Sequence, residues 1–247
     1  MKIEVPGYQV VIEQDYTALA FKGAQFFLEM AKLSKEKWGI FKIAISGGST
    51  PRGMHTVLAQ EDFRSKVPWD KTHIFWADER FVPYESNLSN FGTAKRDFLS
   101  KLPLPHENIH PIPIKETPEL AAETYEAELR RLLFLGDPKP PLLDLVFLGI
   151  GADGHVASLF PGSSVLEEGE RWIGTSMGGE PPIERVTMTL ILINQASVVV
   201  IMASGAEKAD IVKRVLKDND SSLPASRVNP SNGRLVWLLD QEAASRL

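Results

Sequence analysis

Short apolar runs alternate with longer segments of helical periodicity along most of the chain. The apolar runs are rich in β-branched residues and are bounded by glycine, proline, serine or asparagine, which is typical of buried strands. Strands are predicted at residues 8–13, 41–45, 73–77, 142–148, 185–189, 197–203 and 235–239. Helices are predicted after Asp15, over 52–60, over 89–99, over 118–135, after 204–205 and in the last residues.

This order of elements predicts an α/β fold, with a mostly parallel sheet and helices on both faces. Thr50 stands before Pro51 and is expected to cap the helix that follows the second strand. Residues 102–118 are rich in proline and are expected to form a surface connection, and residues 169–182 are expected to be a loose, glycine-rich loop. No repeat or linker divides the chain, so residues 1–247 are expected to form a single domain.

Composition and charge narrow the range of functions. The net charge of −5 argues against a general nucleic-acid-binding protein, which needs an excess of basic residues. The sequence has no cysteine, which excludes disulfides, thiolate nucleophiles and thiolate metal ligands. No run reaches the ~18 apolar residues of a membrane span, and the first residues do not resemble a signal peptide. We therefore expect a cytoplasmic protein that binds no nucleic acid or membrane, and whose partner is a small molecule.

The most informative stretch is residues 142–164, where an apolar strand runs into the turn Gly151-Ala152-Asp153-Gly154-His155. Ligands and chemistry gather at the carboxyl ends of strands in open α/β sheets. His155 has the ordinary pKa range needed for proton transfer near neutral pH, and the glycines permit tight backbone geometry around it. We predict that His155 is catalytic, while a structural or exposed histidine is the alternative.

A second motif, SGGSTP at residues 46–51, joins a predicted strand to a predicted helix. Glycines let backbone amides approach an anion, and a helix N-terminus adds donors and a favourable dipole. The motif lacks the lysine of a P-loop and the GxGxxG of a dinucleotide site. It predicts a phosphate cradle at Gly47, Gly48, Ser49 and Thr50, with an ordinary strand-to-helix turn as the alternative.

Charged residues follow other strands as well. Asp78, Glu79 and Arg80 come directly after the strand at 73–77, and Arg185 and Lys208 begin regular elements late in the chain. Each of these charged residues could simply be exposed to solvent at the end of an element. However, the carboxyl end of a buried strand is where a substrate would lie. No cluster of His, Asp and Glu has metal-binding spacing, so no metal is expected.

Together these motifs resemble the 6-phosphogluconolactonase family. The matching segments are SGGSTP at 46–51, WADERFVP at 76–83, SN at 89–90, LDLVFLGIGADGHVASLFPGS at 143–163, RVTMTL at 185–190 and SGAEKA at 204–209. The resemblance implies hydrolysis of 6-phospho-D-glucono-1,5-lactone to 6-phospho-D-gluconate, the second step of the oxidative pentose phosphate pathway. It implies no metal or organic cofactor. It also implies a fold shared with glucosamine-6-phosphate deaminases and ribose-5-phosphate isomerases, an α/β sheet with Rossmann-like topology.

The resemblance suggests a mechanism. His155 would take a proton from the water that attacks the C1 carbonyl and return it to the leaving ring oxygen. Arg80, or the amides of residues 151–155, would stabilise the oxyanion. Asp78 or Asp153 would orient the imidazole. The phosphate would be held by the cradle at 47–50 together with Arg185 and Lys208.

Two other functions compete with the lactonase. Deaminases of the same fold also carry DGH, but their segment resembles GHIAFNEP, with a glutamate at the position that Phe160 occupies here. A phenyl ring cannot relay a proton, so Phe160 favours the lactonase. A sugar-phosphate sensor would carry an N-terminal helix-turn-helix domain, for which there is no room before Phe41. The oligomeric state is left open between a monomer and a small homo-oligomer.

Overall fold

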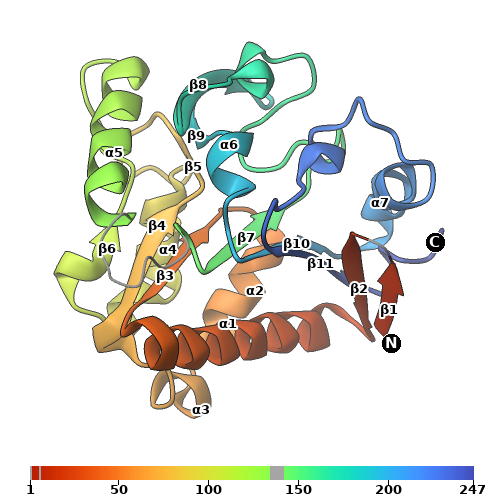
Figure 1. The fold of residues 1–247 in the computed structure, drawn as a ribbon, viewed down its shortest axis with the longest axis horizontal. Coiled ribbons are helices and arrows are strands. Elements are labelled where there is room, and N and C mark those ends of the chain that lie inside the picture. The colour runs from red at the N-terminus through yellow and green to blue at the C-terminus, as the bar shows by residue number, and fades with distance from the viewer. Residues whose placement is uncertain (1, 6, 134–141) are drawn as a thin grey trace.

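The computed structural model describes residues 2–5, 7–133 and 142–247 and confirms the predicted α/β class (Figure 1). Its central sheet has eight strands in the order β1-β2-β11-β10-β7-β3-β4-β6. The strands are β1 Lys2–Val5, β2 Tyr8–Glu13, β11 Arg234–Asp240, β10 Val198–Ala203, β7 Leu145–Gly149, β3 Phe41–Ile45, β4 Thr72–Trp76 and β6 Ile109–His110. Every neighbouring pair is parallel except β1 with β2.

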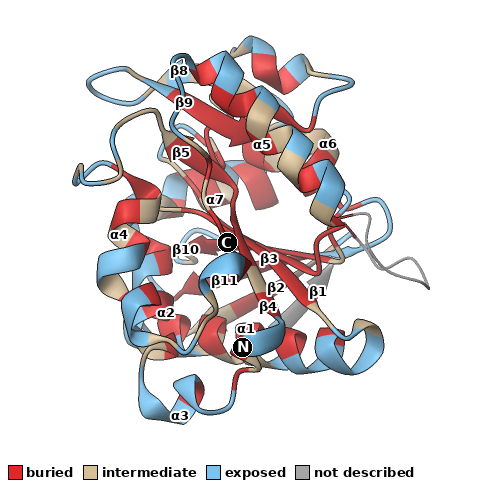
Figure 2. Ribbon diagram, turned by 90° about the vertical axis from the view of Figure 1, so that its left-hand side faces the viewer, coloured by how far each residue is buried: buried red, intermediate tan, exposed pale blue. Residues whose placement is uncertain are grey.

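Helices cover the sheet on both sides. They are α1 Tyr16–Trp38, α2 Ser49–Leu58, α3 Glu61–Arg64, α4 Asn90–Asp97, α5 Pro118–Leu133, α6 Leu190–Ile193 and α7 Ala209–Leu216. The long α1 packs against α2, β3 and β11 on one side, and α5 lies on the other (Figures 1 and 2). Asp15 caps α1 as expected for a residue before a helix, because its side chain accepts a hydrogen bond from the Ala18 amide at 2.9 Å.

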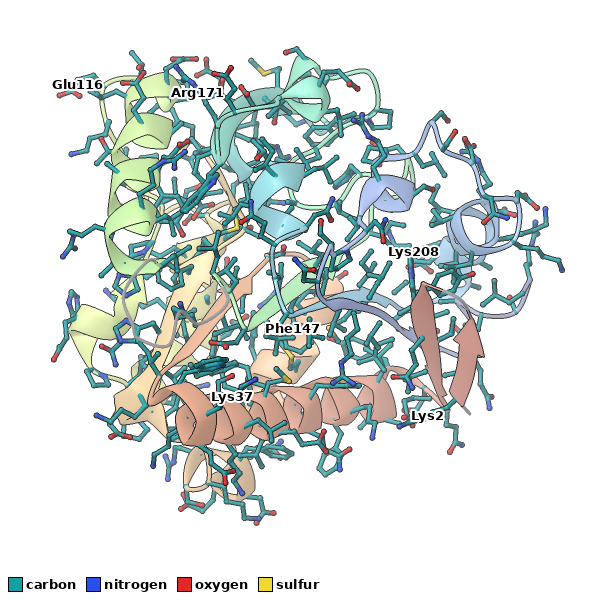
Figure 3. The ribbon with its side chains drawn as sticks, in the orientation of Figure 1. Lys2, Lys37, Glu116, Phe147, Arg171 and Lys208 are labelled. Atoms are coloured by element: carbon teal, nitrogen blue, oxygen red, sulfur yellow. The ribbon has the colours of Figure 1, made fainter. Side chains whose placement is uncertain are left out.

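The core follows from this layering. Strands β3 and β10 are buried at every position, since a parallel strand in the middle of the sheet is covered on both faces (Figure 2). In Figure 3 Phe147 lies within the sheet layer, whereas Lys37, Glu116 and Arg171 are on the outside of the molecule. Among the described residues, no helix is both long and apolar enough to span a membrane.

A second, three-stranded sheet was not predicted. It pairs β5 Asp78–Arg80 with β9 Ile183–Met188, and β9 with β8 Ile173–Gly178, all antiparallel. The prediction of a loose loop at 169–182 is therefore wrong over β8. This strand has the sequence IGTSMG, in which two glycines and a serine weaken the strand signal of Ile173 and Thr175, so its pairing with β9 determines its structure more than local propensity does.

Three smaller predictions also need correction. The proline-rich connection at 102–118 contains β6, which pairs with β4. Helix α2 begins at Ser49 with Gly48 as its N-cap, two residues before the predicted cap Thr50. The last residues form turns rather than a helix. The predicted end of α5 at Leu135 lies outside the described residues.

Candidate active site

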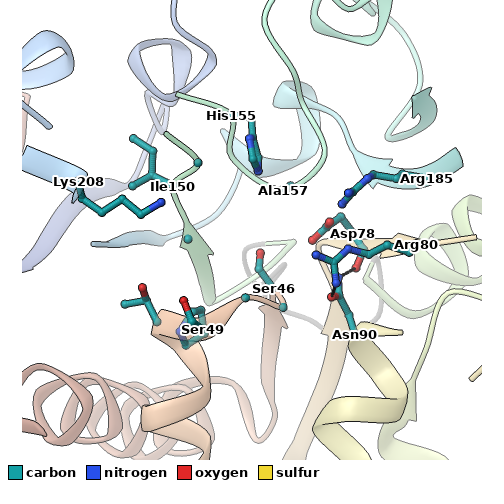
Figure 4. Close-up of a pocket in the computed structure, with 16 residues that line it drawn as sticks. Ser46, Ser49, Asp78, Arg80, Asn90, Ile150, His155, Ala157, Arg185 and Lys208 are labelled. Carbon is teal, nitrogen blue, oxygen red and sulfur yellow. Dashed lines mark hydrogen bonds between the residues drawn. The ribbon is translucent and has the colours of Figure 1, made fainter. Parts of the chain in front are cut away.

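A cavity of about 210 Å³ lies where β3 and β7 end, and it gathers residues that are far apart in the sequence (Figure 4). All the predicted site residues except Asp153 line it: Gly47, Gly48, Ser49, Thr50, Asp78, Arg80, His155, Arg185 and Lys208. The large parallel sheet supplies the cradle and His155, and the small antiparallel sheet supplies Asp78, Arg80 and Arg185. The cavity therefore lies between the two sheets.

The cradle is the turn between β3 and α2. Gly48 has φ 98°, a conformation that L side chains rarely adopt, and as the N-cap it has no side chain to satisfy the first amides of α2. A Cβ on Gly47 would lie 1.9 Å from Oδ1 of Asn90, so only glycine fits there. The uncapped helix start consequently leaves amide donors available at the cavity wall.

His155 is held by Asp153. The Nδ1 atom of His155 lies 2.6 Å from Oδ1 of Asp153, and the amide of His155 donates to the same oxygen at 3.1 Å. Partial desolvation would raise the pKa of Asp153, but the hydrogen bonds and charge of His155 hold that pKa below its usual value. Asp78, the other candidate for orienting His155, accepts a hydrogen bond from the Ser158 hydroxyl at 2.7 Å instead.

The backbone around His155 bears on the expected oxyanion donors. The amide of Gly151 donates to the carbonyl of His155 at 2.9 Å, and the amide of Gly154 donates to the carbonyl of Gly151 at 3.0 Å. The amide of His155 is engaged by Asp153. Three amides of residues 151–155 thus already donate hydrogen bonds within the protein. Arg80 is therefore better placed than these amides to stabilise an oxyanion.

Strand β5 sends alternate side chains to opposite sides. Asp78 and Arg80 line the cavity, whereas the buried Glu79 faces the start of α4. The Glu79 carboxylate accepts four hydrogen bonds of 2.7–2.9 Å, from the amides of Arg80, Asn90 and Phe91 and from the Ser89 hydroxyl. Burial raises the pKa of Glu79, and these bonds oppose that rise. Glu79 therefore positions α4 rather than a substrate.

Asn90 is a cavity residue that sequence reasoning missed. Its Nδ2 donates to the carbonyl of Asp78 at 2.8 Å, and its Oδ1 accepts from Nη1 of Arg80 at 2.8 Å. Asn90 thereby fixes the Arg80 guanidinium between the cradle and β5. Its place after the helix cap Ser89 indicated only a helix start, although a buried asparagine there needs polar partners. Ser46, which also lines the cavity, was likewise not predicted as a site residue.

Three cations surround the cavity without carboxylate partners. Arg80 and Arg185 are directly opposite each other in the β5–β9 pair, and Lys208 follows β10. Among the described residues, no carboxylate oxygen lies within 4.0 Å of their charged nitrogens. Burial, and next the charge of Arg80, lower the pKa of Arg185. Like charges opposite each other are unfavourable, so this wall is suited to an anion.

The described residues contain no group of three or more His, Asp or Glu side chains placed to hold a metal ion. The chemistry that this arrangement can perform is proton transfer by an aspartate-supported histidine beside a site for an anionic group. The fold and the site define an α/β enzyme architecture in which a glycine-rich turn at a helix start lines a cavity at the carboxyl ends of parallel strands.

The family follows from comparison with known sequences. The family model described as "Glucosamine-6-phosphate isomerases/6-phosphogluconolactonase" matches residues 14–237. The chain belongs to this family, as the motif resemblance predicted. The family description includes both the lactonases and the isomerases, so membership alone does not separate the two activities.

Individual relatives carry lactonase names. A probable 6-phosphogluconolactonase 2 of Oryza sativa subsp. indica is 38% identical over 237 residues, covering 91% of this chain and 84% of the relative. A 6-phosphogluconolactonase of Nostoc sp. is 35% identical over 241 residues, covering 96% and 98%. The crystal structure of 6-phosphogluconolactonase from Thermotoga maritima matches with a TM-score of 0.79 and 31% identity, covering 94% of this chain and 98% of that one.

Proposed function

We propose that the chain hydrolyses 6-phospho-D-glucono-1,5-lactone to 6-phospho-D-gluconate. The observation that carries this proposal is the aspartate-held His155 facing a cavity whose other walls bear three cations without carboxylate partners. The relatives named as 6-phosphogluconolactonases support the same reaction. A lactone that carries a phosphate has both features that such a cavity would recognise, an ester carbonyl and a dianion.

The phosphate would bind at the cradle amides of Gly48 to Thr50, with Arg185 and Lys208 completing the charge. A dianion far from C1 supplies binding energy that orients the lactone for attack. The uncapped start of α2 and the cross-strand arginine pair favour this placement. With the phosphate placed there, His155, which lies on a separate loop, can act at the other end of the substrate.

At that end His155 would take the proton of the attacking water. Its Nδ1 is engaged by Asp153, so Nε2 is the atom that acts as base and then protonates the departing ring oxygen. Arg80, fixed by Asn90, would stabilise the oxyanion on C1. No step requires a metal or an organic cofactor.

Phe160 argues against the deaminase activity of the same family. Its ring lies beside the imidazole of His155, with 4.6 Å between the ring centroids. A deaminase of the resembling pattern has a glutamate at this position to assist the histidine, and a phenyl ring can neither donate nor accept a proton. The geometry therefore favours ester hydrolysis over ring opening and amine release.

A paired assay tests the proposal. Hydrolysis of 6-phosphogluconolactone should be much faster than its spontaneous rate, and a chelator should not change turnover. No ammonia should be released from glucosamine-6-phosphate. Ammonia release would support the deaminase instead. Sugar-phosphate binding without turnover of either compound would support a sensor. A single domain, a cytoplasmic location and a monomer or small homo-oligomer remain predictions from the sequence.

A further inference from the structure

A second cavity, of about 200 Å³, adjoins the substrate cavity and is not used by the proposed reaction. The two share a wall made of residues 46–49 with Arg80 and Asn90, of which Ser46, Arg80 and Asn90 are labelled in Figure 4. Beyond this wall the second cavity is lined by residues of α2 and α4, among them Arg52, His55 and Thr93. We call it the rear chamber.

The charged side chains that line the rear chamber are all positive. Two guanidinium groups line it, those of Arg52 and Arg80, and no aspartate or glutamate does. Arg52 is paired with Asp97 outside the lining, through hydrogen bonds of 2.7 and 3.1 Å. Arg80 has no carboxylate within 4.0 Å among the described residues. The chamber therefore carries an uncompensated positive charge.

Polar atoms without partners gather at the same place. Among the described residues, four buried side-chain polar atoms have no hydrogen-bond partner, and three of them belong to residues that line the rear chamber. They are Oγ of Ser46, Nε2 of His55 and Nε of Arg80. Ser46 and His55 are only 5% and 3% exposed. Buried polar groups are almost always hydrogen-bonded in folded proteins, so these atoms point to a missing ligand. Ser46 and Arg80 also line the substrate cavity, whereas His55 lines only the rear chamber of the two.

We propose that the rear chamber is a second binding site for a small oxyanion, represented by inorganic phosphate, distinct from the substrate cavity. The Ser46 hydroxyl and the Nε–H of Arg80 would donate to the anion, and Arg52 would add charge. Bound water alone would satisfy the polar atoms but not the positive charge, so an anion fits better than water. Because Arg80 lines both cavities, an anion in the chamber would weaken the use of Arg80 in turnover without displacing the substrate.

The test measures binding of inorganic phosphate to the full chain by titration calorimetry, with no lactone present. Lys208→Ala first weakens phosphate binding in the substrate cavity, where the cradle amides and Arg185 remain, so the binding that this change leaves at full affinity reports the rear chamber. In that background Arg52→Gln should weaken phosphate binding roughly tenfold, because it removes one of the two positive charges that line the chamber. Arg96→Gln, the same charge change on the outer side of α4, should leave it unchanged, since Arg96 does not line the chamber.

Thr93→Leu is a second variant, which fills the chamber without removing an ion pair and should also abolish this binding. Circular dichroism checks that each variant is folded. The proposal is wrong if Lys208→Ala loses all phosphate binding, or if the Arg52 and Arg96 variants weaken it equally. Neither result bears on lactone hydrolysis, which the paired assay tests separately. In the lactone assay, phosphate bound in the chamber should lower kcat even at saturating substrate. Purely competitive inhibition by phosphate would contradict the proposal.

Discussion

The phenyl ring of Phe160 lies against the imidazole of His155, with 4.6 Å between the ring centroids and 43° between the ring planes. The same phenyl ring lies 5.3 Å from the guanidinium carbon of Arg185. One apolar side chain thus contacts both the proposed base and one of the proposed phosphate ligands. Any displacement of the ring should disturb the two ends of the site together.

Replacing Phe160 by leucine should therefore lower kcat and raise KM at once. The lost aromatic and cation–π contacts correspond to a roughly 3- to 10-fold effect on kcat/KM. Steady-state kinetics with the phosphorylated lactone measure both constants. A change in stability alone, with normal kinetic constants, would show that Phe160 is only a packing residue.

A substitution at Gly178 should displace the ring of Phe160 without changing Phe160 itself. A Cβ at Gly178 would lie 2.3–2.5 Å from three atoms of the Phe160 ring, so Gly178→Ala must push it. We expect Gly178→Ala to reproduce the kinetic defect of Phe160→Leu. Gly169→Ala is the matched control, because nothing lies within 4 Å of a Cβ there. Equal behaviour of the two glycine variants would contradict the idea.

The two aspartates near His155 should behave differently. His155→Ala should lower kcat by roughly 10²- to 10⁴-fold, the usual contribution of a general base. Asp153→Asn should lower kcat markedly, because Asp153 holds Nδ1 of His155. Asp78→Asn removes the charge from the acceptor of the Ser158 hydroxyl and weakens that hydrogen bond, so its first effect should be on the loop and on stability. Measurement of kcat and of urea unfolding for each variant separates these roles, and a reversed order would make Asp78 the orienting residue.

Phosphate recognition predicts a selective effect on substrate affinity. Arg185→Ala and Lys208→Ala should mainly raise KM for the phosphorylated lactone, since each removes a cation from the anion site. Hydrolysis of unphosphorylated gluconolactone serves as the control and should change much less. If both lactones suffered equally, these two residues would not be phosphate ligands.

Acid should destabilise the fold through the buried His55 and the half-buried His73. Desolvation lowers the pKa of His55 and of His73 to about 4. Between pH 6.5 and 4 the unfolded chain therefore binds protons that the folded chain does not, and the free energy of unfolding falls as the pH falls. For His55 this amounts to at most ~3 kcal/mol over the whole window.

Two buried carboxyl groups oppose this trend. Burial raises the pKa of Asp144 to about 6 and also raises the pKa of Glu79, so in acid the folded chain binds these protons more readily than the unfolded one. The lowered pKa of Asp153 acts in the same direction as the two histidines, so the net effect of acid should still be destabilising. His55→Phe, which keeps the stacking on Phe98, should make the dependence shallower in urea titrations between pH 7 and 4. An unchanged slope would contradict the burial of a neutral His55.

The large sheet could be predicted from sequence because its strands have strong local signals. Runs such as FKIAI and VVVIMA are apolar throughout, as parallel strands buried on both faces must be. Most candidate site residues could be named from the sequence because glycines and titratable side chains follow those strands, whereas Arg185 lies within β9 of the small sheet. Their grouping around one cavity then followed from the rule that carboxyl ends of parallel strands meet at one edge.

The small sheet could not be predicted for the opposite reason. Asp78–Arg80 has three charged residues and no strand propensity, and β8 is rich in glycine and serine. Their structure depends on pairing with β9, more than a hundred residues away from β5 in the chain. The roles of Asn90 and Glu79 depend on that pairing, and so they too were invisible to local reasoning.

The opposition of Arg80 and Arg185 has a consequence for how the protein can change over evolution. Side chains alternate along a strand, so slipping β9 by one residue against β5 would place Glu184 or Val186 opposite Arg80. A carboxylate at that position would pair with Arg80 and leave Lys208 as the one unpaired cation of the three, and a valine would leave Arg80 and Lys208. Insertions or deletions in the turn between β8 and β9 would therefore switch the ligand preference of the cavity without altering any residue in it.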